Sequence, residues 1–271
     1  MKRDIMTDNG SSYVELSSHD GIATVRLNDP NDDRFVSEAH PMHRAIRDIF
    51  TRLSDDESVR AVIWAGNDQQ FYPLPELRML SALLKSDPAA PARLQLEAAQ
   101  IVRSIIGFRK PLIAAVASPA IGAGAQIAFL ADFLVASRGT FFQDTHIKVG
   151  LTSGDGATAI WPLVLGLARA RRHILRGTRL SAEEADALGL VTELADSPAE
   201  VLPISQGLAV ELAALPTDAF WTTKLALNQW IGLGASVSSD LASALQIATY
   251  GSPQFLQAMR RSDAALPGQH D

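Results

Sequence analysis

Residues 112–137 read LIAAVASPAIGAGAQIAFLADFLVAS, and the fold assignment rests on this stretch. An apolar run of this length is long enough to cross a bilayer, which takes about 20 apolar residues. Pro119, the small Gly122–Gly124 turn, Gln126 and Asp132 interrupt it. These interruptions favour a buried strand, a glycine-rich turn, a buried helix and a second strand, with no membrane span.

Strand and helix patterns alternate on both sides of this stretch. The expected strands are Ile22–Leu27, Ala61–Ala65, Leu112–Ala117, Phe133–Ala136 and Val191–Leu194. The expected helices are Pro41–Leu53, Leu94–Phe108 and one that begins at the Ser181–Glu184 capping box.

Only helices are expected from Pro198 onward, over 201–215, 219–233, 236–250 and 253–261. This order predicts an α/β core over residues 12–197, a helical region over 198–262, and flexible ends at 1–11 and 263–271. The spacing alone leaves a doubly wound nucleotide-binding sheet open as an alternative.

Composition narrows the class of protein. The chain has 271 residues, 47% of them hydrophobic, so it can bury a large core. Its net charge of −6 argues against a general nucleic-acid binder, and the lack of cysteine excludes disulfides and thiol nucleophiles. The first residues contain no apolar signal segment, so the cytoplasm is the expected compartment. G-x-S-x-G, Walker A and H-E-x-x-H motifs are all absent, which removes common hydrolase, NTPase and metalloprotease assignments.

Two segments carry candidate chemistry. Gly122-Ala-Gly-Ala opens the expected buried helix, where free N–H groups could face an oxyanion or a phosphate. His146 lies in a loop rich in Gly, Thr and Ser, and Asp155 follows nine residues later between two glycines. A histidine with a carboxylate on its far nitrogen is a general base, although a structural histidine in such a loop is the alternative. His40 and His43 are spaced i, i+3 and could share a metal, but no third ligand is evident, so we expect no metal site.

Several segments, taken in order, resemble the crotonase (enoyl-CoA hydratase/isomerase) superfamily. They are GIATVRLNDP (21–30), VRAVIWAG (59–66), the block from Lys110 to Ser137, and FFQDTHIKVGLTSGDGATAIWPLVLG (141–166) with the residues that follow to Val191. The resemblance covers residues 12–262. It implies a spiral of ββα units, a helical trimerisation region, and a trimer or dimer of trimers. It also implies acyl-CoA thioester substrates, with coenzyme A as part of the substrate rather than a separate cofactor, and an oxyanion hole that stabilises an enolate.

The sequence departs from the superfamily's pattern at the positions that matter for hydration. The two catalytic glutamates of its hydratases would fall at Gln126 and His146. The two oxyanion donors would fall at Gly124 and at Pro75, and proline has no N–H. Phe35 replaces a small residue near the CoA-binding turn. We expect Phe35, Tyr72, Gln126 and Trp161 to line the substrate pocket.

A smaller branch of the superfamily fits these departures better. SGDGATAIWPLVLG (153–166), with His146 nine residues before Asp155, resembles the 6-oxocamphor hydrolase and cyclic β-diketone hydrolase branch. That branch uses a His–Asp pair to activate water and cleaves a C–C bond without CoA, by a retro-Claisen step. Its second histidine has no counterpart in residues 121–126, which read IGAGAQ.

The sequence therefore leaves three hypotheses open. The first is an enzyme that forms an enolate-like intermediate from an acyl-CoA or related carbonyl substrate and activates water, with His146 as base and Asp155 orienting it. The second is a CoA-independent C–C hydrolase of cyclic β-diketones. The third is a catalytically weakened paralogue that acts as a binding or assembly subunit. Each predicts a homo-oligomer with a small-molecule ligand, and neither a nucleic acid nor a membrane as partner. A Rossmann-type dehydrogenase is disfavoured, because the third glycine and the ribose-binding acid are missing.

Overall fold

The computed structural model describes residues 14–28, 41–73 and 77–264. Phe35, Pro75 and the predicted N-terminal end at 1–11 lie outside the described residues. At the other end the last helix extends to Ala264, two residues beyond the predicted boundary of the helical region.

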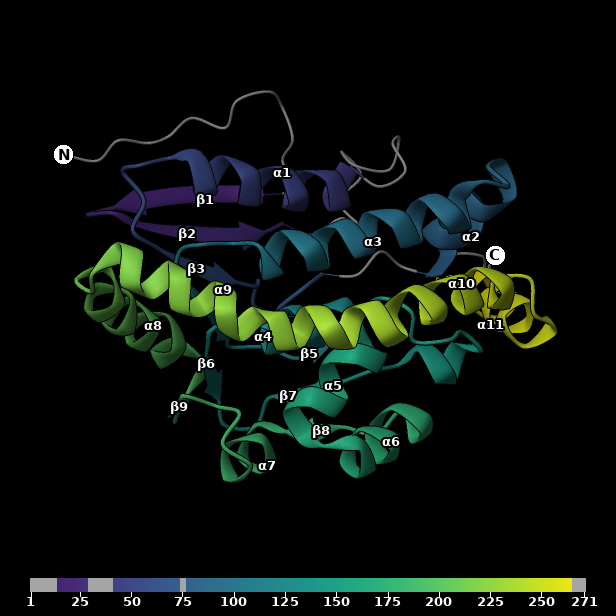
Figure 1. Ribbon diagram of the computed structural model, residues 1–271. Coiled ribbons are helices and arrows are strands. Elements are labelled where there is room, and N and C mark those ends of the chain that lie inside the picture. The colour runs from purple at the N-terminus through teal and green to yellow at the C-terminus, as the bar shows by residue number, and fades with distance from the viewer. Residues whose placement is uncertain (1–13, 29–40, 74–76, 265–271) are drawn as a thin grey trace, which may run out of the picture.

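A six-stranded sheet forms the centre of the molecule (Figure 1). Its order is β1 (Val14–His19), β2 (Ile22–Leu27), β3 (Ala61–Ala65), β4 (Leu112–Val116), β6 (Phe133–Ser137) and β9 (Glu193–Ala195). Only β1 is antiparallel to its neighbour. The strands follow one another in chain order, so this sheet lacks the reversal of a doubly wound sheet. The doubly wound sheet left open by the sequence is therefore excluded.

A second, smaller sheet pairs β5 (Ala120–Ile121), β7 (Phe141–Gln143) and β8 (Leu180–Ser181). The chain passes from β4 in the large sheet to β5 in the small one, and later from β6 to β7. A helix follows β5, and a short 3-10 helix and two α-helices follow β7. This alternation between two sheets is the spiral of ββα units that the resemblance implies.

The centre of the large sheet is buried on both faces, because its strands β3 and β4 are apolar at every position. All five residues of β3 and of β4 are buried. Successive side chains point to opposite faces, so Val62 and Trp64 join one core while Ala61, Ile63 and Ala65 join another.

Different helices cover the two faces of the sheet. Helix α8 (Pro198–Ala213) covers one face, where its Val201, Ala209 and Leu212 pack against β3, β4 and β6. The other face is covered by α1 (Pro41–Asp55), α3 (Ala90–Ile106), α4 (Ala123–Leu130) and α5 (Ala157–Leu165).

Four further helical segments precede β9 in the chain. They are α2 (Leu77–Ser86), the 3-10 helix η2 (His146–Val149), α6 (Leu167–Arg176) and α7 (Ala182–Ala187). Helix α7 begins at the predicted capping box, because Ser181 Oγ accepts the Glu184 N–H at 3.0 Å. Within the described ranges, no helix has both the length and the apolar composition that crossing a bilayer requires.

Helices alone follow β9, as the sequence predicts. Helix α9 (Thr217–Gly234) continues through a π-helical turn, η3 (Ala235–Ser239), into α10 (Asp240–Thr249), and α11 (Pro253–Ala264) follows. Figure 1 shows α9 running along one side of the molecule toward α10 and α11. Phe255 and Met259 of α11 pack with Leu80 and Leu84 of α2, so the C-terminal end closes against the middle of the chain.

A buried ion pair fixes α9 to the core. Lys224 Nζ lies 2.7 Å from Asp132 Oδ2 and donates to the Lys110 carbonyl at 2.9 Å. Asp132 also accepts the Leu112 N–H at 2.8 Å, so one carboxylate joins the start of β4, the end of α4 and the middle of α9. Lys224 is only 5% exposed, so the pair has lost nearly all its water.

Replacing Lys224 by Met should cost about 3–5 kcal/mol of the free energy of unfolding, because it leaves the Asp132 charge buried without a partner. The double variant Lys224→Met/Asp132→Asn should recover much of this loss. Urea denaturation measures both. Arg138→Met breaks an exposed pair with Asp196 and serves as the control, with a much smaller expected effect. Equal losses for Lys224→Met and the control would contradict the assignment of this pair as an anchor.

Candidate active site

The candidate site is built where three segments meet. Gln126 lies on α4, Asp144 and His146 follow β7, and Asp155 lies in the turn before α5. The Gly122 N–H donates to the Gln143 carbonyl at 2.8 Å, which joins the start of α4 to the end of β7. Gly122 has a φ of +55° and Gly156 a φ of +104°, conformations that suit glycine at these two tight turns.

Asp144, which sequence reasoning did not single out, is the carboxylate on the Nδ1 side of His146. Its two oxygens lie 3.1 and 3.2 Å from Nδ1, and it also accepts the His146 backbone N–H at 3.1 Å. Ser153 Oγ donates to it at 2.8 Å and Gln126 Nε2 at 3.2 Å. Burial alone would raise the pKa of Asp144, but the charge of His146 and these hydrogen bonds hold that pKa below its usual value.

Asp155 faces the other ring nitrogen. Its Oδ2 lies 3.7 Å from His146 Nε2, an ion-pair distance that is too long for a hydrogen bond, and its Oδ1 accepts from Gln126 Nε2 at 2.8 Å. Burial and the nearby charge of Asp144 raise the pKa of Asp155, although His146 acts in the opposite direction. The structure thus brings His146 and Asp155 together, but the residue on the far nitrogen is Asp144 and not Asp155.

His146 lies between these two carboxylates with 16% of its side chain exposed. Burial lowers its pKa, but the charges of Asp155 and Asp144 and the Asp144 hydrogen bond outweigh this effect and raise the pKa to about 9. At neutral pH the imidazole is therefore protonated, and in this state it donates a proton rather than accepts one.

The side-chain amide of Gln126 hydrogen-bonds to both carboxylates, and its contact with Trp161 determines its orientation. Trp161 Nε1 is only a donor, and it lies 3.3 Å from Gln126 Oε1. The amide oxygen therefore faces the indole, and the NH₂ group faces Asp144 and Asp155. Both residues are buried, and Trp161 makes edge-to-face contact with Phe129. The structure thus places Gln126 and Trp161 in the hydrogen-bond network of the site.

The expected oxyanion position lies at the start of α4. Gly124 is in the first turn of this helix, where N–H groups have no acceptor four residues earlier within the helix. A Cβ on Gly124 would lie 2.7 Å from Tyr72 Cβ, so this close approach requires glycine. Tyr72 is buried, and burial together with the charge of Asp155 raises the pKa of its phenol, which stays neutral. Pro75, the other expected oxyanion position, lies outside the described residues, as does Phe35.

The same three acid–base groups also have the composition of a cation site. One potential ligand atom from each of Asp144, His146 and Asp155 lies within 4.8 Å of the others. Both oxygens of Asp144 already accept hydrogen bonds, from His146, Ser153 and Gln126, and Asp155 Oδ1 accepts one from Gln126. A cation bound through Asp144 would have to displace some of these bonds.

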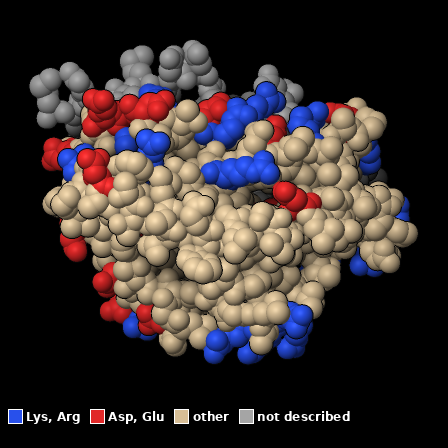
Figure 2. Space-filling model, viewed as in Figure 1, with Lys and Arg blue, Asp and Glu red and all other residues tan. Residues whose placement is uncertain are grey.

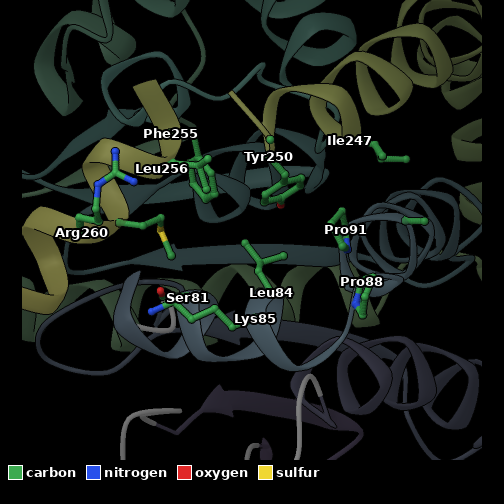
Figure 3. Close-up of a pocket in the computed structure, with 13 residues that line it drawn as sticks. Ser81, Leu84, Lys85, Pro88, Pro91, Ile247, Tyr250, Phe255, Leu256 and Arg260 are labelled. Atoms are coloured by element: carbon green, nitrogen blue, oxygen red, sulfur yellow. The ribbon is translucent and has the colours of Figure 1, made fainter. Parts of the chain in front are cut away.

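A cavity of about 450 Å³ lies beside Tyr250 (Figure 3). It is formed by α2, the start of α3, the end of α10 and α11, with a largely apolar lining that includes Leu84, Pro91, Tyr250, Phe255 and Met259. The Tyr250 hydroxyl lies 3.5 Å from Gln246 Nε2, and Gln246 Oε1 accepts the Gly154 N–H at 2.7 Å. The cavity is therefore one short hydrogen-bond chain away from the turn that carries Asp155.

Comparisons with known proteins identify the family. The family model described as enoyl-CoA hydratase/isomerase matches residues 17–248. A 1,2-epoxyphenylacetyl-CoA isomerase from Escherichia coli is 31% identical over 222 residues, which are 80% of each chain. The protein belongs to the enoyl-CoA hydratase/isomerase family.

Solved structures show that the fold is that of the crotonases. An enoyl-CoA hydratase/isomerase from Mycobacterium paratuberculosis superimposes with a TM-score of 0.85 and 26% identity, over 94% of this chain and all of the other. A β-diketone hydrolase from the cyanobacterium Anabaena superimposes with a TM-score of 0.76 and 25% identity, over 88% of this chain and 94% of the other. The superfamily and fold expected from the sequence are thereby confirmed.

The raised pKa of His146 should make stability depend on pH in the alkaline range. The pKa is about 9 in the folded protein against about 6.5 ordinarily, so the folded state holds this proton more tightly. The resulting stability is fully present below about pH 6.5 and is lost as the pH rises through about 9. We expect the free energy of unfolding of the wild type to fall relative to that of His146→Gln over this range, as measured by urea denaturation. A difference between the two proteins that stays constant with pH would contradict the assigned shift.

Proposed function

We propose that this protein is an enzyme that forms an enolate-like intermediate from an acyl-CoA thioester or a related carbonyl compound, with His146 and Asp155 carrying the mobile proton. The main observation behind the proposal is that His146 Nε2 and Asp155 Oδ2 lie 3.7 Å apart, beside the first turn of α4. Family membership supports acyl-CoA substrates, and the E. coli relative is named as an isomerase of a CoA thioester.

The two groups divide the work of proton transfer according to their charge. His146, with a pKa of about 9, is a proton donor at neutral pH and becomes a base only after Nε2 has lost its proton. Burial and the charge of Asp144 raise the pKa of Asp155, so its carboxylate is a better base than that of an exposed aspartate. Together they can give a proton to one atom of the substrate or water and take one from another.

The negative charge of the intermediate needs its own donors. The first turn of α4 would supply one of them, the Gly124 N–H, in the position that the family resemblance assigns to the oxyanion hole. The apolar cavity beside Tyr250 would accommodate a hydrocarbon substituent of the substrate.

A second candidate is hydrolysis of a C–C bond in a cyclic β-diketone, without CoA. Gln126 favours it, because an amide cannot act as one of the two acids that hydration of a double bond uses in this family. The similarity to the Anabaena β-diketone hydrolase also favours it. In this reaction the His146–Asp155 pair would activate water for attack on one carbonyl, and the departing carbon would leave as an enolate.

Substrate scanning with variants tests the proposal. The wild type should convert enoyl-CoA thioesters of some chain length, or else a cyclic 1,3-diketone without CoA. His146→Ala should lose nearly all turnover, and Asp155→Asn should lose about 10²–10⁴ in kcat, by analogy with other His–carboxylate sites. Product formation is followed by chromatography, and binding of acetyl-CoA, free CoA and the diketones by calorimetry.

His19→Ala is the matched control, because His19 is 79% exposed on β1 and belongs to no part of the site. If neither class of substrate is converted, or if His146→Ala keeps full activity, the proposed function is wrong. If neither class of substrate is converted, the protein is better described as a binding or assembly subunit.

We also propose that the protein is a homo-oligomer, with the trimer or dimer of trimers that the resemblance implies. The helical run from α9 to α10 exposes large apolar side chains, namely Leu227, Trp230, Leu233, Val237, Leu241 and Leu245. Trp230 is 68% exposed and Val237 73%. Figure 2 shows that the centre of this face carries few charges, which gather mainly toward its edges. A second copy of the chain would bury this surface.

Light scattering should find an oligomer at micromolar wild-type protein, and Trp230→Glu/Val237→Glu should shift the mass toward that of a monomer. The added charges would be buried without partners in the interface. Leu96→Glu, which changes a leucine that is 62% exposed on α3, should leave the mass unchanged. A monomeric wild type would refute this proposal.

A further inference from the structure

The hydrogen-bond pattern around His146 assigns different tasks to its two carboxylates. Asp144 reaches Nδ1 with both oxygens, at 3.1 and 3.2 Å, and is itself held by Ser153 Oγ and Gln126 Nε2. Asp155 reaches Nε2 at only 3.7 Å, too far for a hydrogen bond. One carboxylate is thus bonded to the ring, while the other faces it across a gap.

The environment of Asp144 suits a fixed acceptor. Its side chain is fully buried, so it has no water of its own, and four donors take the place of that water. Asp155 differs, because within the described part of the chain Gln126 is the one side chain that donates a hydrogen bond to it. An ionised, fully bonded carboxylate on Nδ1 demands a proton there, which in the neutral ring leaves Nε2 with a lone pair.

We propose that Asp144 is the positioning residue of this site: it holds the Nδ1 proton of His146 and thereby reserves Nε2 for exchange with Asp155 and the substrate. Gln126 supports this division, because Trp161 fixes its amide so that the NH₂ group spans both carboxylates. The assignment deepens the proposed function and rests on it for its catalytic meaning. The sequence suggested that Asp155 orients the histidine. We assign this orienting role to Asp144, two residues before the histidine, instead.

The tautomer of the neutral imidazole is a direct readout that needs no substrate. Asp144→Asn and Asp155→Asn each remove one negative charge beside the same ring, so each should lower the pKa of His146. Their effects on the tautomer should differ, because only Asp144→Asn removes the acceptor of the Nδ1 proton. The ionisable groups that face the ring in the described residues are these two aspartates, and the Tyr72 phenol, which interacts with Asp155, stays neutral.

The experiment is ¹⁵N NMR of the two ring nitrogens of His146, recorded above the titration midpoint of each variant. In Asp155→Asn the proton should remain on Nδ1, the tautomer that a free histidine populates less. In Asp144→Asn it should move to Nε2, toward the remaining Asp155 charge. Asp196→Asn removes an exposed charge and should leave both nitrogen shifts as in the wild type.

The outcomes separate this proposal from the proposed function. A proton on Nε2 in Asp155→Asn would overturn the role of Asp144, and this spectrum suffices even if Asp144→Asn does not fold. Where a substrate is found, Asp144→Asn should lose about 10²–10⁴ in kcat with KM changed little, as expected for a residue that orients a catalytic histidine. The expected tautomers without any turnover would support the positioning role and refute the enzymatic function instead.

Discussion

A buried carboxylate persists only where donors replace its water, and this constraint on Asp144 organises the candidate site. The donors come from α4, from η2 and from the turn before α5. Satisfying one side chain therefore fixes the relative positions of three separate segments. The imidazole, the second carboxylate and the bridging amide take their places as a result. Asp144, on the Nδ1 side of the histidine, thus has a large influence on the geometry of the site.

The central sheet was predictable from sequence because its signal is local. Every residue of β3 and β4 is apolar, as in a strand covered on both faces, and the Ser181 capping box marks the start of α7 without reference to any other segment. The two-residue strands β5 and β8 have no such signal, since two residues show no periodicity. Helix α2 was missed as well.

The candidate site was predictable only in part, for a related reason. His146 and Asp155 lie in a loop whose composition attracts attention, and the structure does bring them together. An aspartate two residues before a histidine occurs equally well in an exposed loop, so the D-x-H spacing does not predict that Asp144 is buried and bonded to the imidazole. Its burial depends on Gln126 and Ser153, which are 18 and 9 residues away. From the sequence, Gln126 is only the position of a missing acid. In the structure its amide donates to both carboxylates, whereas a third carboxylate at this position would repel them.

The locked amide of Gln126 has a consequence for stereochemistry. Both of its N–H groups point to carboxylates, so it has no proton to offer an incoming substrate. Protonation of a planar enolate would then depend on the His146–Asp155 pair, which lies on one side of the substrate. Carbon protonated from one side acquires one configuration, and in heavy water the deuteron would enter one of two otherwise equivalent positions. The handedness of the product would thus be decided by the face of the enolate that is turned toward this pair.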